Sequence, residues 1–204
     1  MLLIVAAISA TVGVSTAWLV ASREFPGCRI FAWLLVLPFA APAYVVAYAY
    51  GDLLDFAGPV QTSLRDWTGL GAGEYAFPQI RSLPGAGLVL GFVLYPYVYL
   101  LAYSAFSRQS GALMEAARSL GASPWRALTS VGLPVARPAI AGGVALALME
   151  TAADYGVVDF YGVATFTSGI FRTWYAQGEQ SAAVQLAGWL FLIVALLVAL
   201  EQFA

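Results

Sequence analysis

Between two strongly apolar segments lies the sequence Glu115-Ala116-Ala117-Arg118-Ser119-Leu120-Gly121, which continues through Ser123-Pro124-Trp125 to Val131-Gly132-Leu133-Pro134. This polar segment is predicted to form two short helices joined by a glycine, and it is too polar to lie in lipid. Ser110 can cap the first helix, whose apolar residues recur at helical spacing: Leu113, Met114, Ala117 and Leu120.

Glycine and proline mark the predicted ends of these two helices. Gly121 falls where a helix commonly ends, because only glycine enters the left-handed conformation there without steric strain. Ser123 and Pro124 start the second helix, with a hydroxyl that can accept from free backbone N–H groups and a proline that needs no N–H there. Gly132 and Pro134 are predicted to end it.

The composition is that of an integral membrane protein. Hydrophobic residues make up 61% of the 204 residues and charged residues only 10%, with no His and no Lys, which is too little charge to cover a soluble domain. Cys28 is the single cysteine, so an internal disulfide or a thiolate metal cluster is excluded. Without His as well, metal ligation is limited to oxygen atoms, and no residue is firmly assigned as a metal ligand.

Five apolar stretches approach the length of about 20 residues that a spanning helix needs. They cover about residues 1–21, 31–51, 84–106, 137–159 and 183–200. Gly13 is one of several small residues that permit close helix packing, and Pro38 and Pro42 predict a kink in the second stretch. The predicted fold is all-α, an integral membrane bundle of five transmembrane helices in one domain, residues 1–204. Both chain ends fall in or beside apolar runs, which indicates part of a longer protein.

Arginine placement predicts the orientation in the membrane. The loop 22–30 and the polar segment with its flanks hold six arginines: Arg23, Arg29, Arg108, Arg118, Arg126 and Arg137. The loops on the other side hold three: Arg65, Arg81 and Arg172. Because cytoplasmic loops carry the excess of positive residues, loop 107–135 is predicted to be cytoplasmic and loop 56–83 extracytoplasmic.

The spacing of the polar segment resembles a motif of ABC-importer permeases: Glu-Ala-Ala, three residues, glycine, nine residues, a β-branched residue, one residue and Leu-Pro. Seven residues match it: Glu115, Ala116, Ala117, Gly121, Val131, Leu133 and Pro134. In that family the segment is a cytoplasmic coupling-helix loop that docks on a separate ATPase, so the resemblance implies an ATPase-coupling role for these residues. It also implies the plasma (inner) membrane of a bacterium.

Further stretches resemble the iron(III) permeases of this family: residues 94–99, 147–156 and 165–170. The resemblance implies one half of a permease for ferric iron in an ATP-driven importer. The implied partners are ABC ATPase subunits, an extracytoplasmic substrate-binding protein and a second permease half, fused or separate, with no nucleic acid and no cofactor. Thiamine and sulfate permeases share the loop and much of the architecture, so thiamine, sulfate or another small solute is an alternative substrate. A membrane scaffold that binds an ATPase without transporting is an alternative of another class.

Three acidic residues lie in or beside the fourth apolar stretch and are candidates for a substrate path, because carboxylates in a membrane are rare and expensive. Glu150 and Asp154 are four residues apart, which predicts one helix face, and Asp159 lies on about the opposite side. Glu150 and Asp154 are interpreted either as a cation-attracting lining or as carboxylates held between helices or in an outer vestibule. For Asp159 the structural interpretation is favoured.

The sequence carries no catalytic constellation. The run Gly69-Leu70-Gly71-Ala72-Gly73 lacks the Gly-Lys-Ser/Thr ending of a phosphate-binding loop. No nucleophile lies beside a general base on any predicted face. The chain is therefore not predicted to be an enzyme, and ATP hydrolysis is expected on a partner subunit.

Overall fold

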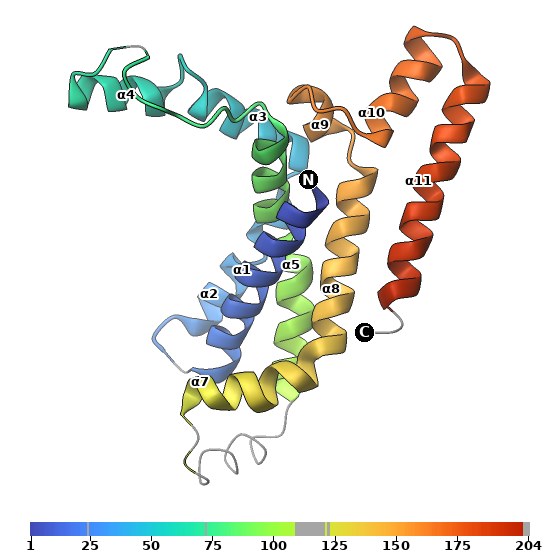
Figure 1. Cartoon of the computed structure of the whole chain (residues 1–204). Helices are drawn as coiled ribbons and strands as arrows, with labels where there is room; N and C mark the ends of the chain where they lie inside the picture. The colour runs from blue at the N-terminus through green and yellow to red at the C-terminus, as the bar shows by residue number, and fades with distance from the viewer. Residues whose placement is uncertain (24, 72, 109–120, 122, 202–204) are drawn as a thin grey trace.

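The computed structural model describes residues 1–23, 25–71, 73–108, 121 and 123–201, and every regular element among them is a helix (Figure 1). In this part of the chain four helical stretches are long and apolar enough to cross a membrane. They are α1 (Leu2–Ser22), α5 (Leu83–Arg108), the continuous helix Trp125–Ala153, and Gln180–Ala199 of α11 (Gln180–Glu201). The predicted all-α membrane bundle is confirmed.

The helix α5 lies at the centre of the bundle, where it packs against α1 and α8 (Leu133–Ala153) (Figure 1). The apolar window of α5 is 72% buried, whereas that of α11 is only 6% buried. Because α11 has so little of its apolar surface covered, it stands at the edge of the bundle, in contact with α8 and α10 (Phe166–Phe171).

Two glycines bring α1 and α8 against the same residue of α5. A Cβ added at Gly13 of α1 would lie 2.7 Å from Val98 Cβ, and one added at Gly143 of α8 would lie 2.7 Å from Val98 Cα. Side-chain atoms do not approach so closely, so glycine is the residue that fits at both positions. Such small-residue crossings allow the van der Waals contact that holds membrane helices together. The packing role predicted for Gly13 is confirmed.

The second predicted span, residues 31–51, is not one continuous helix. It is divided into α2 (Cys28–Leu34), the 3-10 turn η1 (Leu37–Ala40) and α3 (Ala43–Leu54). Pro38 lies in the first turn of η1, and Pro42 immediately precedes α3. Proline ends a helix because it lacks an N–H and its ring clashes with the preceding turn. The two prolines therefore produce a full break where the sequence predicted a kink.

Two tyrosines of α5 satisfy carbonyls beside this break. At the end of α2 the Val36 N–H donates to the carbonyl three residues back, Trp33 O, at 3.1 Å, in place of the carbonyl four residues back, Ala32 O. The Tyr99 hydroxyl donates to Ala32 O at 3.2 Å, and the Tyr95 hydroxyl donates to Leu35 O at 2.8 Å. Unpaired carbonyls at membrane depth are strongly unfavourable. These tyrosines therefore stabilise the broken segment against the central helix.

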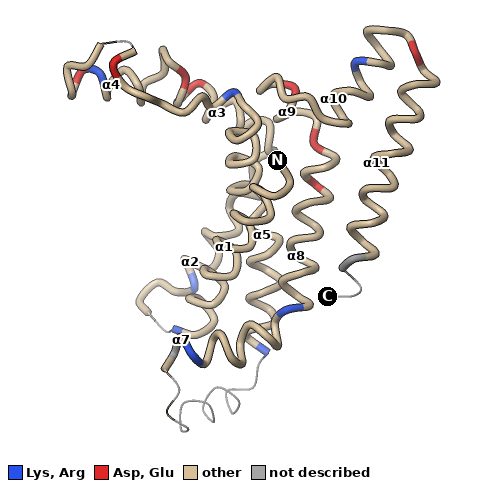
Figure 2. Tube along the Cα trace, viewed as in Figure 1, with Lys and Arg blue, Asp and Glu red and all other residues tan. Residues whose placement is uncertain are grey.

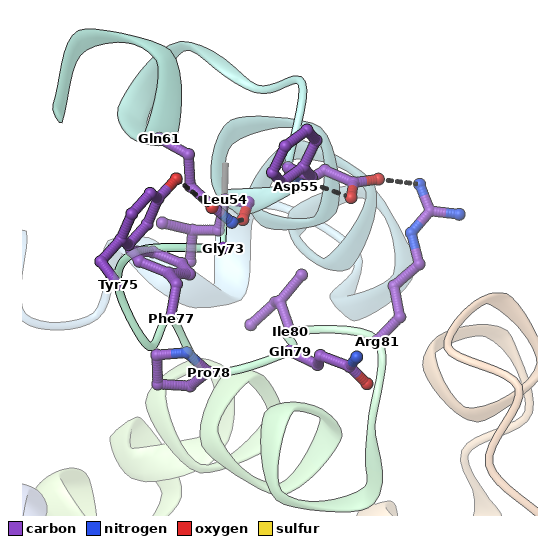
Figure 3. Close-up of a pocket in the computed structure, with 11 residues that line it drawn as sticks. Leu54, Asp55, Gln61, Gly73, Tyr75, Phe77, Pro78, Gln79, Ile80 and Arg81 are labelled. Carbon is purple, nitrogen blue, oxygen red and sulfur yellow. Dashed lines mark hydrogen bonds and ion pairs between the residues drawn. The ribbon is translucent and has the colours of Figure 1, made fainter. Parts of the chain in front are cut away.

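An arm projects sideways from one end of the bundle and consists of α4 (Pro59–Thr68) with the loop after it (Figure 1). Arg65 holds the arm together, donating to Tyr75 Oη at 2.8 Å and to Phe56 O at 3.0 Å. Arg81 pairs with Asp55 at 3.2 Å beside a cavity of about 360 Å³ where the arm meets the bundle (Figure 3). The arm lies within the predicted loop 56–83, and its one helix is too short to span a membrane.

Candidate functional site

The polar segment after α5 is the first candidate site. Gly121 has a φ of +83°, which confirms the predicted left-handed conformation. The Ser123 hydroxyl accepts a hydrogen bond from the Arg126 N–H at 3.3 Å, which confirms its predicted capping role. The first short helix predicted from Ser110 lies outside the described residues, and so do three of the predicted coupling residues: Glu115, Ala116 and Ala117.

The second short helix does not end where the sequence predicted. Gly132 and Pro134 lie inside a helix that continues from α7 (Pro124–Ala127) through the π-helical η2 (Leu128–Gly132) into α8. Gly132 has ordinary right-handed angles, with φ −58° and ψ −56°. The wide π turn just before Pro134 accommodates the proline as a bend, so the helix is not broken. Figure 1 shows this helix crossing the lower end of the bundle before it turns up into α8.

This geometry joins the candidate coupling residues to a spanning helix. Val131, Leu133 and Pro134 are half-buried along the helix that becomes α8. Trp125, by contrast, is 72% exposed near the start of that helix. Trp125 was not among the candidate residues predicted from the sequence, although its position directly after the helix-starting Ser123-Pro124 pair places a large aromatic side chain at the start of a polar-segment helix.

A pocket of about 410 Å³ is the second candidate site, and it lies between α5, α8 and the break in the second span. Its wall includes Phe39 and Pro42 at the break, Tyr97 of α5 and Glu150 of α8. The Phe39 and Tyr97 rings meet edge to face, with centroids 4.6 Å apart. Irregular backbone at membrane depth is tolerated where it is buried in protein or lines a polar cavity. The break at Pro38 and Pro42 is therefore stable at this position, because its irregular backbone lines the pocket and does not face lipid.

Glu150 is the exposed carboxylate of this pocket. It lies in the last turn of α8, near the end opposite the polar segment. Counted from Arg137 at about 1.5 Å per residue, it lies roughly 20 Å along the helix. In the described part of the chain, no hydrogen bond or ion pair holds its carboxylate. Whether Glu150 belongs to a substrate path or to an outer vestibule stays a prediction.

Asp154 does not share a helix face with Glu150, contrary to the prediction. The helix α8 ends at Ala153, and Asp154 has an extended backbone with φ −65° and ψ 132°. Its Oδ2 accepts hydrogen bonds from the N–H groups of Val157 at 3.1 Å and Val158 at 3.2 Å, in α9 (Gly156–Phe160). The predicted helix 137–159 breaks here because the carboxylate satisfies the free N–H groups of a new helix.

The other acidic candidate, Asp159, lies on α9 and is exposed, outside the set of residues that line the pocket. The structure therefore brings Glu150 and Asp154 to one pocket and leaves Asp159 apart. Among the described residues, no three acidic or cysteine side chains gather as a potential metal site.

Acidic positions gather toward one end of the bundle, whereas basic positions lie at both ends. Figure 2 shows basic positions near the end where α1 and α5 finish and α7 lies, and acidic positions together with further basic ones at the opposite end. The described arginines in segments at that opposite end are Arg65, Arg81 and Arg172. Five of the six arginines predicted for one side are described, and they lie at or near the end with α7: Arg23, Arg29, Arg108, Arg126 and Arg137. Arg118 lies outside the described residues.

Comparison with protein families decides what the chain is related to. The model of the family described as "Binding-protein-dependent transport system inner membrane component" matches residues 9–200. The chain belongs to this family. Membership agrees with the ABC-permease resemblance of the Glu115–Pro134 motif, and it makes the chain a membrane-spanning transport component of a family that is not catalytic.

Curated relatives of this inner membrane component are named for sulfate and molybdenum. The probable sulfate transport system permease protein cysT of Nephroselmis olivacea is 31% identical over 156 residues, which cover 76% of this chain and 52% of the relative. The molybdenum transport system permease protein ModB of Escherichia coli K12 is 30% identical over 158 residues, which cover 78% and 64%. The chain thus spans about half the length of the sulfate relatives that it matches. These names do not support the specific resemblance to iron(III) permeases.

Solved ABC transporters share the fold of this inner membrane component. A chain of the MetNI methionine ABC transporter superposes with a TM-score of 0.72 at 16% identity, covering 99% of this chain and 88% of that one. A chain of a bacterial alginate ABC transporter, in complex with its alginate-bound periplasmic protein, superposes with a TM-score of 0.71 at 16% identity, covering 98% and 74%. At this identity the likeness shows the fold alone.

Proposed function

We propose that the chain is the permease part of an ATP-driven importer and moves a small solute with energy from a separate ATPase. The family match over residues 9–200 carries the proposal. The pocket beside the broken second span supports it, because transporters commonly build solute sites where discontinuous helices line a cavity. A scaffold that binds an ATPase without transporting would have no use for such a pocket.

The coupling surface is proposed to be loop 107–135. The arginine-rich end of the bundle would then face the cytoplasm, since cytoplasmic loops carry the positive excess, and the arm with α4 would face outward. Exposed Trp125 lies on the cytoplasmic side in this orientation, where a soluble ATPase could cover it. The continuous helix from α7 into α8 would carry the movement of the ATPase to the pocket that Glu150 lines.

The solute is proposed to be a small oxyanion of the sulfate type, in place of ferric iron. Both relatives at 30% identity or more described above are named for sulfate or molybdenum, and molybdenum in water is chiefly the oxyanion molybdate. The names of the relatives carry this choice, because the described wall of the pocket has too few free carboxylates to ligate ferric iron, while Glu150 there would repel an oxyanion. The Asp154 carboxylate already bonds two backbone N–H groups, which leaves Glu150 as the one uncommitted carboxylate.

A second permease half is proposed as the partner in the membrane. The chain matches only about half of its sulfate relatives, and α11 leaves most of its apolar surface uncovered by the described chain. A solute path needs polar groups enclosed on all sides, because lipid cannot satisfy them. The path would therefore run between this chain and its partner.

Reconstitution of the complete importer tests the proposal. Proteoliposomes would contain the permease, its ATPase and the cognate binding protein, and would receive sulfate, molybdate, thiamine or ferric iron in parallel. We expect uptake and solute-stimulated ATP hydrolysis with an oxyanion. Stimulation by ferric iron alone would overturn the solute class, and ATPase binding without uptake of any solute would favour the scaffold.

A further inference from the structure

A groove at the arginine-rich end of the bundle is not used by the proposed transport path. It has a volume of about 400 Å³ and lies where α2 and the end of α1 meet α5. Its wall is largely apolar, with Val20, Val36 and Leu100 contributed by three different segments. The rings of Tyr99 and Tyr103 stack along it, with centroids 5.8 Å apart. The volume lies within the range of about 300–1,000 Å³ typical of ligand pockets.

The groove also contains one cation. Arg29 lines it and is exposed, whereas the hydroxyl of Tyr99 is already bonded to Ala32 O. Both ion pairs in the described part of the chain belong to Arg81, near the opposite end of the bundle. Acidic positions that the structure describes also gather toward that opposite end (Figure 2). The groove thus combines apolar surface with a guanidinium that has no described carboxylate partner.

Trp33 indicates the depth of the groove in the membrane. It lies four residues after Arg29, so the two side chains share one face of α2, and it is 79% exposed. Exposed tryptophan and arginine at the end of a spanning bundle are typical of the headgroup level of a bilayer. The apolar wall formed by α5 continues from this level toward the centre of the membrane.

We propose that this groove binds an anionic phospholipid. An acyl chain would lie against the apolar wall, and the phosphate would pair with Arg29. Basic residues between helices at the membrane boundary are suited to anionic headgroups, and the other described arginines at this end add to the positive potential. The inference goes beyond the transport function, because it does not depend on which solute is carried.

Cys28 provides a reporter at the site, because it lines the groove and is the only cysteine in the chain. The importer would be reconstituted in phosphatidylcholine vesicles with increasing fractions of phosphatidylglycerol. The rate of Cys28 modification by N-ethylmaleimide would then be measured in each. A bound lipid covers the thiol, so phosphatidylglycerol should slow the modification. In Arg29→Gln, half-protection should need about five-fold more phosphatidylglycerol, which corresponds to about 1 kcal/mol for one arginine at the surface.

Matched variants separate the site from general surface charge. Arg23 lies at the same end but does not line the groove. In Arg23→Gln, phosphatidylglycerol should therefore protect Cys28 as well as it does in the wild-type protein. Arg29→Lys retains the positive charge, so most of the protection of Cys28 should remain. Equal protection in Arg29→Gln and Arg23→Gln would overturn the proposal. The proposal would also be overturned if Cys28 were equally protected in pure phosphatidylcholine whenever the importer is assembled. A second permease chain would then be what covers the groove.

Discussion

The carboxylate of Asp154 accepts a hydrogen bond from the backbone N–H of Val157 at 3.1 Å, directly after α8 ends. Val157 is fully buried, so this contact fixes the start of α9 against the bundle. The backbone carbonyl of the same aspartate accepts from the Thr167 hydroxyl at 2.6 Å, in α10. Asp154 thus joins the pocket to the two short helices that follow it.

We expect Asp154→Ala to destabilise the protein by about 0.5–2 kcal/mol, because α9 loses its capping acceptor. Asp154→Asn keeps a side-chain oxygen and should lose much less. Thermal unfolding in detergent measures both variants. Equal stability of the two substitutions would show that the carboxylate does not cap α9.

For Glu150→Gln we expect oxyanion uptake per assembled complex to stay level or to rise by about two- to five-fold, because a repelling charge leaves the pocket wall. If the solute were a metal cation, the same substitution should reduce its uptake. Asp159→Asn is the matched control, since Asp159 is exposed and does not line the pocket. A large loss of sulfate or molybdate uptake in Glu150→Gln would contradict the vestibule role.

Gly121→Val should uncouple ATP hydrolysis from uptake while the chain still inserts in the membrane. The substitution strains a backbone at φ +83° by on the order of 1–3 kcal/mol and misdirects the helix that follows. Gly69→Val is matched to it, because Gly69 has φ +70°, and an added Cβ would meet nothing within 4 Å at either glycine. Gly69 lies on the arm, so its substitution should leave coupling intact. The same loss of coupling in both variants would remove the special role of Gly121.

Gly143→Ala should destabilise the bundle by about 1–3 kcal/mol, because the added methyl meets backbone of α5 at Val98. Gly188→Ala on α11 is the control, since a Cβ there meets nothing within 4 Å and alanine favours helix. Unfolding in detergent compares them. No difference between the two alanines would mean that the α5–α8 crossing is looser than described.

Much of the membrane architecture follows from local chemistry. Three apolar stretches, predicted at 1–21, 84–106 and 183–200, become helices within a few residues of their predicted limits, because burial of backbone polar groups in lipid leaves few other conformations. The stretch predicted at 137–159 is also helical, but its helix starts earlier and ends at Ala153. The left-handed Gly121 and the Ser123 cap were also predictable, since each depends on the conformational range or hydrogen bonding of single residues. The permease motif at Glu115–Pro134 was recognisable from its spacing alone, and the family match agrees with it.

Only the tertiary structure decided where helices break and what the breaks are for. Pro38 and Pro42 predicted a kink, but a complete break is stable because Tyr95 and Tyr99, distant in sequence, supply hydrogen bonds to the open carbonyls. Pro134 predicted a helix end, yet a π turn carries the helix past it into α8. Asp154 fitted a helical face by spacing, although its carboxylate instead starts α9. Spacing along a chain records which conformations are allowed locally, whereas the contacts that choose among them come from residues far away in sequence.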